Sequence, residues 1–448
     1  MIVRYLKKLK EIGIFMGNVN LTIHRGTKEI GGSCVELRTG NSRILIDFGM
    51  PLVTGDGKRF DSKSIEGKTR EELVQLNILP GVKGLYKNEE KAIDGILISH
   101  AHLDHYGFLD YIHPDIPVYM SQGAKELIDI TNIFITKKNG NINSSIVKHL
   151  RSFQVGAFKI TPYLVDHSAF DALAFLVEAE GRRIFYSGDF RGHGRKSVLF
   201  DRMVKEPPQD IDCLLMEGSM LGRGDKICDD EEGVQERIEK ILKGSDNITF
   251  LFSSSQNIDR LVSAYKACLK TGSTFVIDLY TAFILDRLEE ISSKLPQFDW
   301  KNVRVKFTKY HADRLADSGH KELLYKYNSG KIEMDEINKK KSRVLMLTRD
   351  NSIFPIILKN IDNPEGAKII YSMWEGYLTD KFWKYCDEKG LVLEQVHTSG
   401  HATVGDLKTF AKAMQPKILI PIHTFDASKY PELFDNVKML DDREEFQC

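Results

Sequence analysis

The sequence is poor in cysteine and has no excess of charge of either sign. Its 448 residues include six cysteines, and no two of them form a CxxC pair. This scatter argues against a disulfide framework and against a cysteine zinc site, and it favours a reducing, cytoplasmic environment. Lysine and arginine together number 63, as do aspartate and glutamate, so no overall basic field indicates a polyanionic partner. A surface that binds a polyanion must therefore be local.

Long hydrophobic runs are also lacking. No stretch is long and apolar enough to cross a membrane, so we expect no membrane partner. Residues 1–15 are basic and amphipathic, but their apolar run is too short for the core of a signal peptide, and we interpret them as a basic leader. The composition, with 42% hydrophobic and 28% charged residues, is typical of a globular chain of two or three domains. It leaves open whether the chain forms a homodimer.

The pattern of apolar residues changes twice along the chain. Up to about residue 219, short apolar strands alternate with Gly, Asp and Ser turns, and many of them end on a residue that can bind metal. Longer helical periods then alternate with strands, which is typical of an α/β unit. The last segment returns to a strand, a helix and a strand. We therefore predict a first domain at 1–219, an inserted α/β domain at 220–387, and a C-terminal completion of the first domain at 388–448.

The run HAHLDH at residues 100–105 carries three of the 13 histidines. On an extended segment side chains alternate, so His100 and His102 point the same way and can share an ion. We expect the chain to turn there into a helix over LDHYGFLDYIH, which aims Asp104 and His105 at a second ion. Helix capping and ordinary packing explain most isolated histidines, but this density favours a metal site.

Other strand ends supply further candidate ligands, namely His167, Asp189 and His423. Nitrogen and oxygen ligands without thiolate favour zinc, with manganese as the main competitor. The histidines outside such contexts are expected to have surface or core roles; they include His24, His113, His149, His193, His311 and His320.

HAHLDH resembles the HxHxDH signature of the metallo-β-lactamase fold, an αββα sandwich with a dinuclear metal edge. The resemblance implies two ligand sets that one carboxylate, Asp189, bridges. The set for one ion is His100, His102 and His167. The set for the other ion is Asp104, His105 and His423. Asp47, in ILIDFGM, matches a carboxylate that braces the histidine loop, and such an outer group affects metal binding nearly as much as a ligand.

The inserted domain resembles that of the β-CASP subgroup, which acts on nucleic acids. Glu217 in LLMEGS, His401 in SGHA and His423 in PIH match the three motifs of that subgroup. The resemblance implies a hydrogen bond between Glu217 and His401, with His401 protonating the leaving oxygen. A histidine at the third motif points to RNA rather than DNA, and the C-terminal run is most similar to the ribonuclease J lineage.

The predicted function is therefore hydrolysis of single-stranded RNA, by exonucleolytic or endonucleolytic cleavage. The resemblance implies two Zn²⁺ ions, or Mn²⁺, which activate a hydroxide. It assigns catalytic roles to Asp189, His401, Glu217 and Asp47.

Candidate substrate contacts lie in two further segments. In FSSSQNIDRL a strand runs into a helix, so its backbone and its Ser254, Ser255, Asn257 and Arg260 side chains could hold a phosphate, although simple helix capping is an equal alternative. YSMWEGYL replaces a loop that ribonucleases J use for substrate, which makes Ser372 and Trp374 candidates. Outside these two segments, Ser399 of SGHA is another candidate, and Arg191 and Arg195 could meet phosphates near Asp189.

Three other functions compete with this prediction. A DNA nuclease of the same subgroup would share the site. A hydrolase of small esters or thioesters would share the metals, but such enzymes rarely need an insertion of this size or an SGHA motif. A scaffold with a decayed site would have lost ligands, whereas all seven are present.

Overall fold

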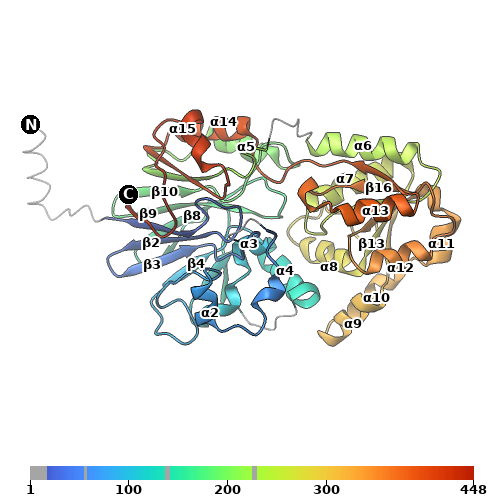
Figure 1. Cartoon of the computed structure of the whole chain (residues 1–448), viewed down its shortest axis with the longest axis horizontal. Helices are drawn as coiled ribbons and strands as arrows, with labels where there is room; N and C mark the ends of the chain where they lie inside the picture. The colour runs from blue at the N-terminus through green and yellow to red at the C-terminus, as the bar shows by residue number, and fades with distance from the viewer. Residues whose placement is uncertain (1–17, 55–57, 137–141, 224–229) are drawn as a thin grey trace, which may run out of the picture.

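The computed structural model describes residues 18–54, 58–136, 142–223 and 230–448, which form two lobes (Figure 1). The predicted leader at residues 1–15 lies outside the described residues. One lobe holds two of the three sheets, and the other lobe holds the third. Among the described helices, none combines the length and the apolar character that crossing a membrane requires.

The first sheet has seven strands in the order β19, β1, β2, β3, β4, β5 and β6. Their bounds are β1 Asn20–Arg25, β2 Cys34–Thr39, β3 Ser42–Ile46, β4 Gly95–Leu97, β5 Val118–Met120, β6 Ser144–Ile146 and β19 Glu445–Gln447. In β3, Ile44 and Ile46 enter the core between the two sheets, whereas Leu45 packs toward the helices outside. This alternation is the period of two that a strand imposes, and it gives the sheet two apolar faces.

The second sheet has six strands in the order β18, β11, β10, β9, β8 and β7. Their bounds are β7 Phe153–Val155, β8 Phe158–Leu164, β9 Leu173–Ala179, β10 Arg182–Tyr186, β11 Cys213–Glu217 and β18 Ile418–Ile422. In β11, Cys213 and Leu215 face the first sheet, while Leu214 and Met216 face outward. The two sheets therefore share one apolar core, and burial between them removes a large apolar area from water.

Helices cover the outer face of each sheet. Those that pack toward the first sheet are α2 Arg70–Gln75, α3 Leu103–Tyr106 and α4 Gln122–Thr131. Those on the second sheet are α5 Ser197–Lys205, α14 Val404–Met414 and α15 Tyr430–Leu433. The lobe is thus an αββα sandwich, which confirms the predicted fold class.

The third sheet is parallel throughout and forms the other lobe, in the order β14, β13, β15, β12, β16 and β17. Its strands are β12 Thr249–Phe252, β13 Thr274–Asp278, β14 Val303–Lys306, β15 Val344–Thr348, β16 Lys368–Tyr371 and β17 Val392–Gln395. The helices of this inserted lobe are α6 Glu231–Lys243, α7 Ile258–Thr271, α8 Leu279–Leu288, α9 Lys309–Asp317, α10 Glu322–Tyr327, α11 Met334–Lys339, α12 Ile353–Lys359 and α13 Asp380–Glu388. Because both faces of such a sheet are covered, its inner strands β12, β13, β15 and β16 are largely apolar and buried, whereas the edge strands β14 and β17 are more polar.

The two lobes share buried contacts. The ring of Phe134, which follows α4 of the sandwich lobe, lies 5.1 Å from the ring of Tyr280 in α8 of the inserted lobe. Ile128 and Ile130 of α4 belong to the same apolar cluster as Phe283 of α8. The lobes therefore meet across a packed interface, and this interface keeps the inserted lobe close to the loops of the sandwich.

In its fold, the described part of the chain differs from the sequence prediction at two places. The inserted domain does not end at residue 387, because β17 Val392–Gln395 pairs with β16 in the third sheet. The helix expected over LDHYGFLDYIH is only the single turn α3, followed by the 3-10 turn η2 Leu109–Tyr111. Phe108 donates its backbone N–H to Phe48 at 3.1 Å, and this tertiary hydrogen bond ends the helix early.

Candidate metal centre

The candidate ligands gather at one edge of the sandwich because the strands before them point the same way. Strands β10, β11 and β18 are parallel, so their carboxyl ends meet at that edge. Asp189 follows β10, Glu217 ends β11 and His423 follows β18. His167 follows β8, and His100 follows β4 of the facing sheet. Residues more than 300 positions apart in the chain are therefore brought together.

All seven candidate ligands converge there. Together with His401 they form four groups, and within each group the ligand atoms lie within 4.8 Å of one another. The groups are His100–His102–His167, His100–His105–Asp189, Asp104–His105–His423 and Asp189–His401–His423. The first and third groups are the two ligand sets that the motifs imply. Asp189 lies between them: its Oδ2 is 3.1 Å from Nε2 of His105 and 3.6 Å from Nε2 of His100.

The donor atoms are arranged to bind a metal rather than to form hydrogen bonds with one another. His100 Nε2 lies 3.1 Å from His102 Nδ1, which lies 3.3 Å from His167 Nε2, so three ring nitrogens face a common point. Among the described residues, three buried atoms of this cluster have no hydrogen-bond partner: His105 Nε2, Asp189 Oδ2 and His423 Nε2. Buried polar atoms without a partner cost about 1–3 kcal/mol each, and a bound cation would satisfy all three.

The protonation of the histidines also suits metal binding. Burial, followed by the nearby histidines, holds the pKa of His100 well below its ordinary value, and the same two causes act on His167. Burial likewise lowers the pKa of His102 to about 4. Near pH 7 these rings are neutral, which is the form that binds a metal through a ring nitrogen.

Asp47 braces the histidine loop from beneath. Its carboxylate accepts hydrogen bonds from the Ser99 backbone at 2.8 Å and from the Tyr186 hydroxyl at 2.7 Å, and it lies 2.8 Å from Nδ1 of His105. Because Nδ1–H of His105 donates to this carboxylate, Nε2 is the nitrogen left for a metal. Asp47 itself has a positive φ of 60°, a strained backbone of the kind that clusters at functional sites.

Glu217 and His401 lie beside the ligand cluster and contact each other. His401 Nδ1 is 3.3 Å from Glu217 Oε1, and Glu217 is fully buried. The backbone N–H groups of Phe190 and Ser219 also donate to the Glu217 carboxylate, each at 3.1 Å. Burial lowers the pKa of His401, but Glu217 and then Asp189 outweigh it and raise the pKa above the ordinary value. His401 is therefore held ready to carry a proton.

The predicted substrate contacts have mixed positions. Arg260 is fully buried: it pairs with Glu231 at 3.1 Å and donates to the carbonyl of Ser372 at 2.9 Å. Ser255 is buried and contacts Thr281 at 2.5 Å. These contacts with protein groups give Arg260, Ser255 and Ser372 interior positions away from solvent.

The remaining candidates either are exposed to solvent or contact residues close to them in the structure. Asn257 accepts a hydrogen bond from the backbone of Arg260 at 3.1 Å, which is the capping alternative. The Ser399 hydroxyl lies 3.2 Å from the sulfur of Met220. Ser254 and Trp374 are exposed. Trp374 thus remains a candidate for substrate contact.

A buried ionic network lies behind the site, and the sequence motifs did not predict it. The buried Arg191 pairs with Asp259 at 2.6 Å, and Arg195 donates to the side chain of Gln235 at 2.9 Å, so both arginines expected to meet phosphates bind protein groups instead. Glu231 joins the network through Arg260. The one signal in the sequence was the position of Arg191, two residues after Asp189.

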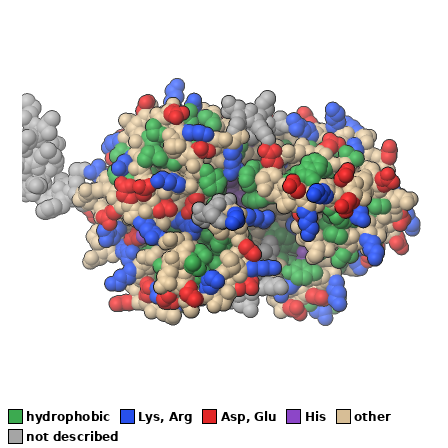
Figure 2. Space-filling view, in the orientation of Figure 1, with side chains coloured by type: hydrophobic (Ala, Val, Ile, Leu, Met, Phe, Trp, Pro, Cys, Tyr) green, Lys and Arg blue, Asp and Glu red, His purple; other side chains and the backbone are tan. Residues whose placement is uncertain are grey.

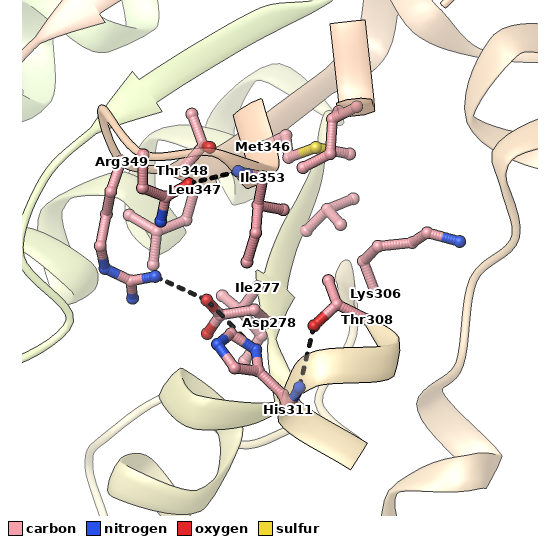
Figure 3. Close-up of a pocket in the computed structure, with 13 residues that line it drawn as sticks. Ile277, Asp278, Lys306, Thr308, His311, Met346, Leu347, Thr348, Arg349 and Ile353 are labelled. Atoms are coloured by element: carbon pink, nitrogen blue, oxygen red, sulfur yellow. Dashed lines mark hydrogen bonds and ion pairs between the residues drawn. The ribbon is translucent and has the colours of Figure 1, made fainter. Parts of the chain in front are cut away.

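A second polar cluster lies at the carboxyl ends of β13 and β15 (Figure 3). Asp278 pairs with Arg349 at 2.7 Å and lies 3.9 Å from His311. The cavity that these side chains line holds only about 20 Å³, roughly the space of one water molecule. It has no room for a nucleotide, and its carboxylate is already paired with Arg349.

Comparisons with known proteins agree with the geometry. Residues 74–236 match the beta-lactamase superfamily domain, and residues 391–430 match the Zn-dependent metallo-hydrolase RNA specificity domain. The sandwich lobe thus has the metallo-β-lactamase fold that the motifs predict.

Two curated relatives cover most of this chain. Transcription termination factor FttA of Methanothermobacter thermautotrophicus is 24% identical over 446 residues, which span 89% of this chain and 65% of that protein. Ribonuclease J of Mycoplasma genitalium is 26% identical over 434 residues, which span 92% of this chain and 69% of that protein. The chain therefore spans about two thirds of the length of these relatives, and the resemblance to ribonuclease J predicted from the motifs is confirmed.

A solved structure shows that the fold extends over nearly the whole chain. It is a protein of unknown function from Enterococcus faecalis V583, with a TM-score of 0.76 and 22% identity. The match covers 96% of this chain and all of that one.

Proposed function

We propose that the protein is a metal-dependent ribonuclease that hydrolyses phosphodiester bonds of single-stranded RNA. The observation that carries the proposal is the convergence of seven metal-competent side chains beside the Glu217–His401 pair. A site for hydrolysis needs both parts: one that stabilises negative charge on the phosphate and one that supplies a proton to the leaving oxygen.

Two Zn²⁺ ions, or Mn²⁺, are the cofactors that this donor set suits. When bound, such a pair supplies Lewis acidity to the phosphate and lowers the pKa of water. His100, His102 and His167 would hold one ion. Asp104, His105 and His423 would hold the other, with Asp189 shared between them. Free cysteines lie buried elsewhere, so the set lacks thiolate, which agrees with these metals.

Side chains of the protein supply the other functions that hydrolysis requires. Asp47 orients His105, so that its Nε2 stays aimed at the cluster. Glu217 stabilises the protonated form of His401, which can donate its proton to the departing 3' oxygen. The inserted lobe stands over this edge of the sandwich, and Figure 2 shows a recess between the lobes in which histidine atoms are visible. A single strand could enter the site through this recess.

RNA is favoured as the substrate by the C-terminal segment. The RNA specificity match includes both His401 and His423, the residues of the second and third motifs. One relative is named ribonuclease J, which supports the same substrate class for this chain. The inserted domain lies in the chain between the two parts of the sandwich. We propose that it selects RNA over small esters.

The test is cleavage of end-labelled RNA by the purified protein and by Asp189→Ala. RNAs with 5'-monophosphate, 5'-triphosphate and 5'-hydroxyl ends are compared with DNA of the same sequence. We expect the protein to cut RNA and the variant to be inactive. Cleavage of DNA alone would support the DNA-nuclease alternative, turnover of a generic ester alone would support the small-molecule hydrolase, and metal-loaded protein without turnover would support the scaffold.

A further inference from the structure

Two exposed aromatic rings and two arginines form a cluster beside the metal centre. The rings of Trp374 and Tyr377 lie 5.2 Å apart at 86°, and each leaves 41% of its surface exposed. The guanidinium of Arg223 lies 4.5 Å from the centre of the Trp374 ring, and that of Arg59 lies 5.4 Å from the centre of the Tyr377 ring. Exposed large aromatics that neighbour one another indicate a binding surface.

The two arginines of the cluster connect to different loops of the metal site. Arg59 pairs through a β-bridge with Val53, and the nearby Pro51 pairs in the same way with Gly31, whose backbone N–H donates to Nδ1 of His423 at 3.3 Å. On the other side of the cluster, the sulfur of Met220 lies 3.2 Å from the hydroxyl of Ser399, which precedes His401 by two residues. Arg223 also follows Glu217 closely in sequence, in the turn where its N–H donates to Met220. The cluster thus lies beside the loops that carry His401 and His423.

The turn that carries the aromatic rings holds them in place. Tyr377 N–H donates to the Trp374 carbonyl at 3.1 Å, which closes the 3-10 turn η6 Glu375–Tyr377. A Cβ at Gly376 would lie 2.3 Å from a carbon of the Trp374 ring, so the indole can fold over the turn only because residue 376 is glycine. The rings are therefore positioned before any ligand arrives, which lowers the entropy cost of binding.

From this arrangement we infer a subsite that stacks an unpaired nucleobase of single-stranded RNA next to the metal centre. Its residues are Arg59, Arg223, Trp374 and Tyr377. Aromatic faces stack on any base, and arginine can contact both an aromatic face and a phosphate. Because the whole chain has no net charge, attraction of RNA needs a local surface of this kind. The inference rests on the proposed function and names how that site positions its substrate.

The first test separates binding from chemistry in the kinetics. We expect Trp374→Ala to raise the KM for a single-stranded RNA about tenfold while kcat changes less than about twofold, since base–aromatic stacking is lost. Trp374→Phe keeps an aromatic face and should restore most of the affinity. Trp383→Ala is the matched control, because Trp383 lies on α13 and is similarly exposed, at 47%. Equal KM values for Trp374→Ala and Trp383→Ala would overturn the inference.

The second test needs no activity. With EDTA present, a single-stranded oligoribonucleotide should quench tryptophan fluorescence, and an abasic strand of equal charge should quench it much less. The quench should be lost in Trp374→Phe and kept in Trp383→Phe. Equal quenching by the abasic strand, or a quench that survives Trp374→Phe, would rule out stacking on Trp374.

The two tests also separate this inference from the proposed function. If the wild-type protein cuts no RNA, the proposed function fails, and the fluorescence test still decides whether the subsite binds bases. If the wild-type protein cuts RNA, but Trp374→Ala keeps the wild-type KM and the quench survives in Trp374→Phe, only the subsite fails.

Discussion

Arg191 donates a hydrogen bond to Asp259 across the boundary between the lobes, with 2.6 Å between Nη2 and Oδ2. Both residues are buried, and Arg191 follows Asp189 by two positions. The same guanidinium donates through Nη1 to the carbonyl of Ser399 at 2.8 Å, two residues before His401. One side chain therefore ties the Asp189 loop, the His401 loop and α7 together, which links the inserted lobe to the geometry of the site.

Replacing this arginine should destabilise the protein strongly. Arg191→Met leaves Asp259 and Asp166 buried without their partner, which typically costs about 3–5 kcal/mol. The free energy of unfolding, measured by urea denaturation, is the readout. Arg38→Met is the control: its pair with Glu445 is exposed and should contribute less than about 1 kcal/mol. Equal losses in the two variants would show that the buried network is not what holds the lobes.

Glu231 makes the stability of this network depend on pH. Burial raises its pKa, but Arg260 and Arg191 outweigh burial and lower the pKa from 4.5 to about 2. A carboxyl whose pKa is lower in the folded state stabilises the fold above the unfolded pKa, and this contribution is lost as the pH falls from about 4.5 to about 2. The contribution at pH 7 is on the order of 3 kcal/mol.

Glu231→Gln should therefore be less stable than the wild-type protein at pH 7, and the difference should shrink below pH 4.5. Urea unfolding at pH 7, 5, 4 and 3 measures it. Glu445→Gln is the matched control, because this carboxylate is paired at the surface, and its difference should stay small at every pH. A difference for Glu231→Gln that stays constant down to pH 3 would contradict the assigned role of its charge.

Much of the site could be predicted because its chemistry is local in the sequence. Four of the candidate ligands lie within six consecutive residues, namely His100, His102, Asp104 and His105. Their spacing alone indicates shared ions. The αββα fold was predictable from the short strands and their motifs. Asp47 and Glu217 were identified only through resemblance, since a single carboxylate at a strand end has no pattern of its own.

Long-range contacts could not be predicted. Arg260 sits at the start of a helix after a serine-rich strand end, which looks like a phosphate site, but its partner Glu231 lies 29 positions earlier and buries it. β17 was assigned to the wrong domain because its pairing with β16 depends on tertiary structure, not on the residues of β17. The short α3 follows from a hydrogen bond between Phe108 and Phe48, which are 60 positions apart.

Loss of the Asp47 charge should weaken metal binding without removing a ligand. In Asp47→Asn the side chain no longer fixes the tautomer of His105 or stabilises its ring, and such changes typically lower metal affinity about 10–100-fold. Metal content after dialysis against a graded chelator series measures the effect. Asp441→Asn, at an exposed ion pair, should bind metal like the wild-type protein. Unchanged affinity in Asp47→Asn would show that the histidine loop holds its shape without this carboxylate.

Glu217 and His401 should act as one catalytic unit. Since proton transfer by a positioned residue typically contributes about 10²–10⁴-fold, His401→Ala should lower kcat for RNA by that factor. Glu217→Gln removes the charge that keeps His401 protonated, so it should lower kcat through the same step. The double variant should then be no slower than His401→Ala alone, because residues that share one step are not additive. Single-turnover cleavage of end-labelled RNA measures all three rates.

Metal content separates this role from that of a ligand. His401→Ala should retain metal, whereas Asp189→Ala, which removes the shared carboxylate, should lose it. His320→Gln, at a half-buried histidine of the inserted lobe, controls for the loss of an imidazole as such and should keep the wild-type rate. If the effects of Glu217→Gln and His401→Ala multiply in the double variant, the two residues serve separate steps, and the 3.3 Å contact between them is not the path by which Glu217 affects the reaction.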